Sequence, residues 1–172
     1  MTSDAQPLSP SERHAELPLA ELERYPVLAA CVKAWREAPR RGELPACLPV
    51  DRVPAEAEPY TMLLDYLPET RDARVRFAGH YVGERARFDA AGRTLRGYFD
   101  ESDAEIVFDG LARAADTRAP TLARRDYVAI DGRHCRYVRL ILPLASDGKT
   151  VDGFFKTVEP STLEILSPVV AA

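Results

Sequence analysis

Two Asp-Gly dipeptides constrain the fold of this chain most, because each stands between runs of β-forming residues. Asp131-Gly132 separates Tyr127–Ile130 from Cys135–Leu144, and Asp147-Gly148 separates the latter run from Val151–Val158. An Asp-Gly pair flanked by such runs is a strong short-range signal for a β-hairpin. Two hairpins in succession predict a three-stranded antiparallel meander in this part of the chain.

The middle strand of this meander predicts a cover on both faces of the sheet. Leu140, Ile141 and Leu142 follow one another, so apolar side chains point to both sides near the end of the strand. A strand with one face in water should alternate between apolar and polar residues. Another element must therefore cover the second face.

The segment YPVLAACVKAWREA, residues 25–38, predicts a helix that can provide this cover. Pro26 suits the first turn of a helix, and Pro39 marks its end. Four apolar side chains recur at the spacing of one helix face, namely Leu28, Cys31, Val32 and Trp35. This stripe can cover the sheet over Tyr137, Arg139 and Ile141, pack against the same stripe of a second subunit, or do both. We expect contact with the sheet together with a modest dimer interface.

Two further strands and a second helix are predicted before the meander. The strands are Tyr60–Leu67 and Arg74–Val82, and alternation places Val75, Phe77 and Tyr81 of the latter on one face. A helix begins at the acidic residues near Asp100, which suit a helix N-terminus, and turns Val107, Leu111 and Ala114 or Ala115 inward.

The chain divides into three regions. Residues 1–59 form a disordered tail, the helix described above and a proline-rich connector; residues 9–12 have the spacing of a helix-capping box. Residues 60–160 form the core, and residues 161–172 form a C-terminal tail. The expected fold class is α+β, with two packed layers around one core.

Several short segments add a family resemblance to this order of elements. They are Trp35-Arg36, Gly42-Glu43-Leu44-Pro45, the strand Tyr60–Leu67, the segment RVRFAGHYV and Gly92–Gly97. With them, residues 20–160 resemble the PAS superfamily, and within it a single-PAS-domain subfamily common in alphaproteobacteria. The resemblance implies a five-stranded antiparallel sheet in the order 2-1-5-4-3, with helices enclosing a pocket on one face and an N-terminal helical extension.

The resemblance also implies a set of pocket residues. The aromatic side chains on the elements that would line the pocket are Phe77, Tyr81, Tyr98, Phe99, Phe108 and Tyr127. Ordinary core packing explains the same residues equally well. The sequence names no cofactor, so the ligand stays unknown.

Motifs for catalysis and metal binding are weak. Gly148-Lys149-Thr150 resembles the end of a phosphate-binding loop, but the required upstream glycine is replaced by Pro143 and a strand follows. His134 and Cys135 are adjacent in a strand, so they point to opposite faces and make neither a metal site nor a nucleophile–base pair. A haem could use His80 or His134, although exposed strand histidines are the simpler interpretation. We expect no enzyme and no bound metal.

A local excess of arginine suggests either an ion-paired surface or an anion- or nucleic-acid-binding patch. Its members are Arg71, Arg74, Arg76, Arg85, Arg87, Arg93 and Arg96. Neighbouring acids favour the ion-paired surface. The net charge of −4 gives no general attraction to nucleic acid or to anionic membranes.

Composition sets the cellular context. No run approaches the ~20 apolar residues of a membrane span, and the N-terminus has no signal-peptide pattern. Cys31, Cys47 and Cys135 are too scattered for a disulfide framework and indicate a reducing compartment. Arginine outnumbers lysine and asparagine is absent, a bias associated with bacterial genomes. We therefore expect a bacterial cytoplasmic protein.

Together these features predict a sensor or signalling module that binds a small molecule or a protein partner and acts on another chain, as a homodimer. The alternative is a structural adaptor with a filled core that acts through its N-terminal helix. An unrecognised enzyme is the third interpretation.

Overall fold

The computed structural model of the chain describes residues 14–82, 90–99, 101–128 and 134–166. The strands in these ranges are β1 (His14–Leu17), β2 (Met62–Leu67), β3 (Asp72–Ala78), β4 (Thr121–Val128), β5 (His134–Leu144), β6 (Gly153–Val158) and β7 (Glu164–Leu166). The helices are α1 (Pro26–Glu37), α3 (Leu95–Tyr98) and α4 (Glu101–Thr117), with short 3₁₀ turns between elements.

The described strands form one antiparallel sheet in the order β1-β4-β5-β6-β2-β3, and β7 pairs with the first residues of β5. Numbered along the chain from β2, the five strands β3-β2-β6-β5-β4 have the order 2-1-5-4-3. This confirms the predicted strand order and makes the fold PAS-like. Strands β1 and β7 were not predicted. They extend the sheet beyond this core.

The meander is confirmed. Strand β4 pairs with β5, and β5 pairs with β6, both antiparallel. Its first turn lies outside the described residues. In the second, Gly148 has a φ of +79°, which favours glycine, and Asp147 Oδ1 accepts hydrogen bonds from the N–H groups of Lys149 and Thr150. The phosphate-loop-like residues therefore form a strand connection.

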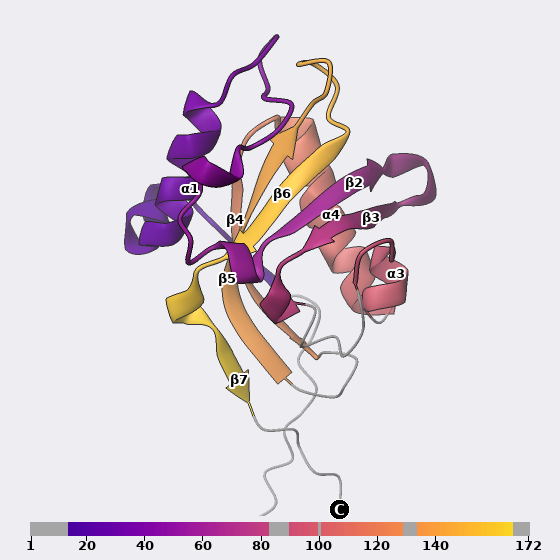
Figure 1. The fold of residues 1–172 in the computed structure, drawn as a ribbon. Helices are drawn as coiled ribbons and strands as arrows, with labels where there is room; N and C mark the ends of the chain where they lie inside the picture. Colours follow the sequence, from indigo (N-terminus) through magenta and orange to yellow (C-terminus); the bar gives the residue numbers. More distant parts are fainter. Residues whose placement is uncertain (1–13, 83–89, 100, 129–133, 167–172) are drawn as a thin grey trace, which may run out of the picture.

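Helices cover both faces of the sheet (Figure 1). On the inner face, α3 and α4 pack over a core that includes Leu111, Ile141 and Phe154. On the outer face, α1 packs over a second core that includes Leu140 and Phe155. Both faces of β5 are thus buried, as its run of apolar residues predicted.

The stripe on α1 is buried against the sheet of its own chain. Leu28, Cys31, Val32 and Trp35 are all buried, and Trp35 Nε1 donates a hydrogen bond of 2.8 Å to the carbonyl of Pro143. The side chains of β5 predicted to lie beneath α1 are the wrong alternate set, because Tyr137, Arg139 and Ile141 face the inner side. The β5 side chains that pack beneath α1 are Val138, Leu140, Leu142 and Leu144.

Strand β3 also departs from strict alternation. Leu63 pairs with Phe77 but Leu64 pairs with Val75, so a β-bulge shifts the register between them. Val75 therefore points into the inner core, whereas Phe77 is 41% exposed on the outer side. The prediction that these two residues share a face is wrong, because Arg76 is the extra residue of the bulge and the alternation of faces is broken there.

The strand ends earlier than Val82, the end predicted from the sequence. Gly79 lies so close to the preceding chain that a Cβ atom there would be 2.1 Å from the carbonyl oxygen of Glu58. Residues 80–82 are helical, so Tyr81 does not continue the strand.

Two of the described strands lie within the regions predicted before and after the core. In the N-terminal region, β1 pairs with β4; in the predicted C-terminal tail, β7 pairs with β5. The capping-box residues 9–12 lie outside the described residues.

Candidate functional site

The inner face of the sheet buries charged side chains where a closed core should be apolar. Three cations come from neighbouring strands in the described part of the chain: Arg125 of β4, Arg139 of β5 and Lys156 of β6, which are 1%, 2% and 5% exposed. Lysine and arginine are almost never buried this fully unless they are paired. We call Arg125, Arg139, Lys156 and the buried carboxylate of Asp103 the inner charged cluster.

Arg139 is held from several sides. Its NH1 atom donates hydrogen bonds to the carbonyl and the hydroxyl of Thr121 at 3.2 and 2.9 Å. Its NH2 atom lies 3.6 Å from Glu16 Oε1 and against Gly110 of α4, where a Cβ atom would approach it to 2.7 Å. Burial lowers the pKa of Arg139 to about 10, although Glu16 opposes this shift.

Glu16 reaches this guanidinium because β1 adds a strand beside β4. Its Oε1 atom also lies 2.8 Å from His14 and 3.1 Å from Arg113 of α4. Burial raises the pKa of Glu16, but the His14 hydrogen bond and the Arg139 charge outweigh this effect and lower it overall. Glu16 is therefore the carboxylate that accompanies Arg139.

Arg125 lies beside Asp103, which the first turn of α4 places over the sheet. Arg125 NH2 and Asp103 Oδ1 are 3.8 Å apart, and both side chains are buried. A buried ion pair has a large desolvation cost, so it is weak evidence for stability.

Lys156 has different surroundings from the two arginines. Its cross-strand neighbours are Met62 and Ile141, and its Nζ atom lies 5.5 Å from the centroid of the Phe99 ring. Among the described residues, no carboxylate and no hydrogen-bond acceptor contacts this ammonium group. Burial, together with the charges of Arg125 and Arg139, holds the pKa of Lys156 well below its usual value.

Such a cluster has the properties expected of a binding site. Titratable groups with strongly shifted pKa values gather at functional sites, although structural ion pairs also shift them. The inner cluster combines two guanidinium groups, an ammonium group and an aromatic ring. It can therefore attract and orient an anionic group.

The sequence-based pocket set is only partly brought together. Phe99 and Phe108 are buried in the inner core, whereas Tyr81 packs on Tyr60 with ring centroids 4.7 Å apart. Phe77 is on the outer face. The side chains of Tyr98 and Tyr127 lie outside the described residues.

The predicted pocket residues include none of the charged members of the cluster, because only aromatic side chains were expected to line the pocket. A usable signal existed. Arg139 lies within VRLIL and Lys156 within FFKT, so each interrupts a strand that is otherwise apolar. A cation within such a strand is a candidate for burial.

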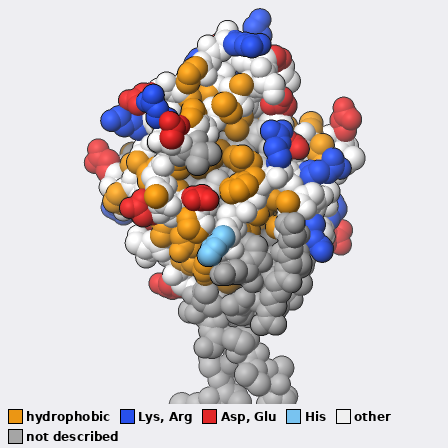
Figure 2. All heavy atoms as spheres, viewed as in Figure 1, with side chains coloured by type: hydrophobic (Ala, Val, Ile, Leu, Met, Phe, Trp, Pro, Cys, Tyr) orange, Lys and Arg blue, Asp and Glu red, His pale blue; other side chains and the backbone are white. Residues whose placement is uncertain are grey.

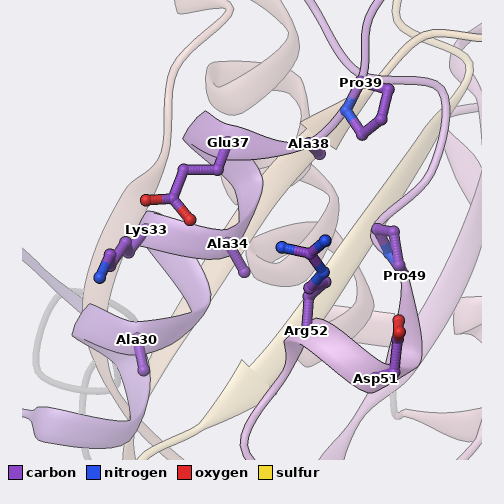
Figure 3. Close-up of a pocket in the computed structure, with 9 residues that line it drawn as sticks. All are labelled: Ala30, Lys33, Ala34, Glu37, Ala38, Pro39, Pro49, Asp51 and Arg52. Carbon is purple, nitrogen blue, oxygen red and sulfur yellow. The ribbon is translucent and has the colours of Figure 1, made fainter.

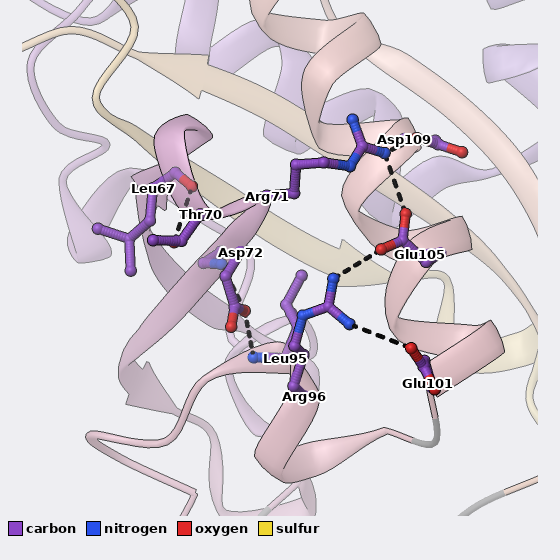
Figure 4. Close-up of polar contacts among 10 residues, drawn as sticks. Leu67, Thr70, Arg71, Asp72, Leu95, Arg96, Glu101, Glu105 and Asp109 are labelled. Atoms are coloured by element: carbon purple, nitrogen blue, oxygen red, sulfur yellow. Dashed lines mark hydrogen bonds and ion pairs between the residues drawn. The ribbon is translucent and has the colours of Figure 1, made fainter.

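An ion-paired network links α4 to the turn after β2 and to α3 (Figure 4). Arg71 contacts Glu105 and Asp109 at 3.0 Å, and Arg96 contacts Glu105 at 2.6 Å. Asp72 Oδ1 accepts the N–H of Leu95 at 2.9 Å, which holds the start of α3. This part of the arginine run is thus an ion-paired surface.

The remaining arginines of the run differ in their surroundings. Arg76 pairs with Asp65, and Arg74 and Arg93 are exposed. Arg85 and Arg87 lie outside the described residues. The predicted ion-paired surface therefore holds for Arg71, Arg76 and Arg96.

The histidine and cysteine of β5 take separate roles. His134 pairs with Asp126, which also contacts Arg136 at 3.1 Å, while Cys135 is buried in the inner core. No group of three or more potential metal ligands occurs among the described residues. His80, the other haem candidate, is exposed.

Two of the hollows among the described residues lie on the outer side near α1 and β2. One of about 450 Å³ separates α1 from the 3₁₀ turn Val50–Arg52 and has charged walls, including Lys33, Glu37 and Arg52 (Figure 3). The other, of about 500 Å³, is apolar; its walls include Leu48, Val53, Leu63, Phe77 and Phe155. Apolar side chains gather over the centre of the face shown in Figure 2.

No protein-family model and no curated protein matches this chain. Among solved structures, the chain is similar to an RNA-binding light-oxygen-voltage receptor, with a TM-score of 0.44 and 12% sequence identity. The similarity covers 83% of this chain and 33% of the receptor, so the chain spans about a third of the receptor's length. A similarity this low carries no information about ligand or activity, and the PAS-like fold rests on the strand order.

In the part of the chain that the structure describes, no helix has both the length and the hydrophobicity needed to cross a membrane.

Proposed function

We propose that this chain is a bacterial cytoplasmic sensor module of PAS type, which binds a small molecule on the inner face of its sheet and acts on another chain. The observation that supports this most directly is the burial of Lys156 without a carboxylate partner among the described residues. A ligand that contacts the inner charged cluster would supply the missing interaction.

The energetic argument favours binding over structure. Replacing buried ionic groups by apolar residues of similar volume is often neutral or stabilising, so such groups are not needed to hold a core together. An apolar side chain in place of Lys156 would pack against Met62, Ile141 and Phe99 without a desolvation cost. A buried cation at this position therefore points to recognition.

Strand β6 connects the proposed site to the opposite face. Lys156 points inward, while the adjacent Phe155 belongs to the outer core beneath α1. At the end of the same strand, Glu159 holds the first turn of α1 through hydrogen bonds to Val27 and Leu28. A ligand that shifts β6 would therefore also shift α1, the element through which we propose the module acts.

Native mass spectrometry of the purified protein tests the proposal. We expect an added small-molecule mass under native conditions that disappears after denaturation. The mass should be lost or reduced in Lys156→Met and retained in Lys33→Met, because Lys33 is exposed on α1. If no small molecule accompanies the protein and a broad metabolite panel leaves its melting temperature unchanged, the proposal is wrong.

The second candidate function is the adaptor, and the apolar hollow around Phe77 favours it. A large aromatic side chain that is 41% exposed beside other apolar walls can pack against a second copy of the chain. We propose a homodimer on this basis. Light scattering should then show a dimer for the parent and a monomer for Phe77→Glu, whereas an identical mass for both would contradict it.

Neither candidate includes a catalytic step. That the chain is not an enzyme stays a prediction, and reproducible turnover lost on replacing Cys135 or His134 would contradict it.

A further inference from the structure

In the described part of the chain, each arginine of the inner charged cluster has a carboxylate nearby. Arg139 is accompanied by Glu16 at 3.6 Å, and Arg125 by Asp103 at 3.8 Å. Lys156 lies on the next strand and has no such carboxylate. The described side chains therefore leave one positive charge without a nearby negative one.

The surroundings of Lys156 restrict the chemistry of a molecule that could supply this charge. Directly opposite Lys156 on the neighbouring strands are the apolar residues Met62 and Ile141, and the Phe99 ring lies beside its ammonium group. A hydrated inorganic ion would lose its water against such neighbours. An organic anion would place its charge on Lys156 and its hydrocarbon part against these side chains.

The two arginines favour the same type of ligand. Arg139 lies two residues from Ile141, the cross-strand neighbour of Lys156, on the same face of β5. Its charge and that of Arg125 both lower the pKa of Lys156. Arg139 donates to Thr121 through NH1, and its position is fixed by Gly110 of α4. A negative charge at Lys156 would thus enter a field set by fixed cations.

We propose that Lys156 binds the carboxylate of a small organic monoanion, whose hydrocarbon part packs against Phe99 and Met62. This inference rests on the proposed function, because it names the ligand class of the same site. The ligand places one negative charge beside Lys156, the one cation of the cluster that no described carboxylate contacts.

The lysine content of the chain allows a direct test. The sequence has three lysines, Lys33, Lys149 and Lys156, and the first two are exposed. Labelling with lysine that carries ¹³C at the ε-position therefore gives one NMR signal for each. Full-length protein, freed of bound molecules by unfolding and refolding, is titrated with sodium propionate and sodium benzoate at constant ionic strength. Sodium chloride and sodium phosphate serve as comparison salts.

We expect both carboxylates to move the Lys156 signal saturably toward the position of a charged ammonium group, while the signals of Lys33 and Lys149 stay in place. Calorimetric titration should give an affinity at least tenfold weaker for Lys156→Met than for the parent. The matched control Lys149→Met should bind like the parent, because Lys149 lies in the turn between β5 and β6.

Three results would overturn the inference. The first is an unchanged Lys156 signal at salt concentrations that begin to move the Lys33 signal. The second is an equal response to chloride or phosphate, which would make the site one for inorganic anions. The third is a co-purified neutral molecule that Lys156→Met retains.

The third result separates the two proposals. It would leave the small-molecule sensor in place and remove only the carboxylate. If the native protein carries no ligand and no metabolite changes its melting temperature, the proposed function fails and this inference fails with it.

Discussion

Glu159 accepts a hydrogen bond from the backbone N–H of Leu28 at 3.1 Å, although the two residues are far apart in the sequence. The same oxygen accepts the N–H of Val27 at 3.0 Å. Helix α1 has no side-chain cap of its own, since Tyr25 precedes it and Pro26 opens it. A carboxylate from the end of β6 therefore satisfies the first donors of the helix.

Removing this cap should destabilise the protein. In Glu159→Ala, two backbone N–H groups lose their acceptor, and we expect the free energy of unfolding to fall by about 1–3 kcal/mol. Glu159→Gln keeps an oxygen acceptor and should lose less. Urea unfolding measures both variants. Equal stability of Glu159→Ala and the parent would show that water or another group replaces the cap.

Because of Lys156, the free energy of unfolding should rise with pH, whereas a salt-bridged lysine makes it fall with pH. The folded pKa of Lys156 lies below its unfolded value of about 10.4, so the unfolded chain binds more protons between the two pKa values. The free energy of unfolding should therefore rise with pH across that window. Below the folded pKa both states are protonated, and the contribution of Lys156 becomes constant at its least favourable value.

Lys156→Met tests this directly on ligand-free protein. We expect the free energy of unfolding near neutral pH to increase by about 1–4 kcal/mol, as when buried ions are replaced by apolar groups. The rise of the free energy of unfolding with pH should become shallower. The part that remains comes from Arg139, whose pKa is about 10. Urea unfolding over a pH series provides the measurement. A less stable variant with an unchanged slope would mean that Lys156 is satisfied in the folded protein.

The three cysteines should differ in reactivity. Burial, and secondarily the charge of Glu159, raises the pKa of the Cys31 thiol to about 12, and Cys135 is also buried. Cys47 is exposed. A thiol reagent such as dithionitrobenzoate should modify Cys47 alone in the native protein and all three cysteines after unfolding. Cys47→Ser should abolish the native reaction; fast modification of that variant would show that the outer core around Cys31 or the inner core around Cys135 opens readily.

Gly79 is the glycine whose replacement should be most damaging. A Cβ atom there would meet the carbonyl oxygens of Glu58 and Pro59 at 2.1 and 2.5 Å, and backbone atoms cannot move aside cheaply. We expect Gly79→Ala to cost at least about 2 kcal/mol. Gly97→Ala is the control, because its nearest atom would be 3.8 Å away. Similar melting temperatures for the two variants would contradict the close approach at Gly79.

Local patterns predicted the elements well. The apolar stripe gave α1, the Asp-Gly pairs gave the meander, and the double-sided apolar run of β5 required a cover on each face. These signals work because helix period, turn chemistry and burial each act within a few residues.

Non-local features escaped the sequence. The inward direction of Arg139 depends on which side α1 occupies, and a shift by one residue exchanges the two faces. The direction of Phe77 depends on a bulge opposite Leu63, and β1 exists only because β4 accepts it as a neighbour. The buried cations were missed because charge normally indicates exposure. Only the assembled sheet shows that they converge.

Trp35 combines packing with a hydrogen bond, and two substitutions separate these contributions. Trp35→Phe keeps most of the ring volume but removes the donor to the Pro143 carbonyl, so we expect a loss of about 1–3 kcal/mol. Trp35→Ala also removes the ring that covers the outer core, and should cost about 3–5 kcal/mol. Combined with Val32→Asp, which buries a charge under α1, it should unfold much of the population at moderate temperature.

Circular dichroism melting with light scattering checks this series. The stripe on α1 is buried against its own sheet. We therefore expect the melting transition of each variant to begin at a lower temperature than any change in its molecular mass. A variant that keeps the parent's melting temperature would show that α1 is a loosely attached tail. A variant that melts normally but becomes monomeric would move the dimer contact from Phe77 to α1.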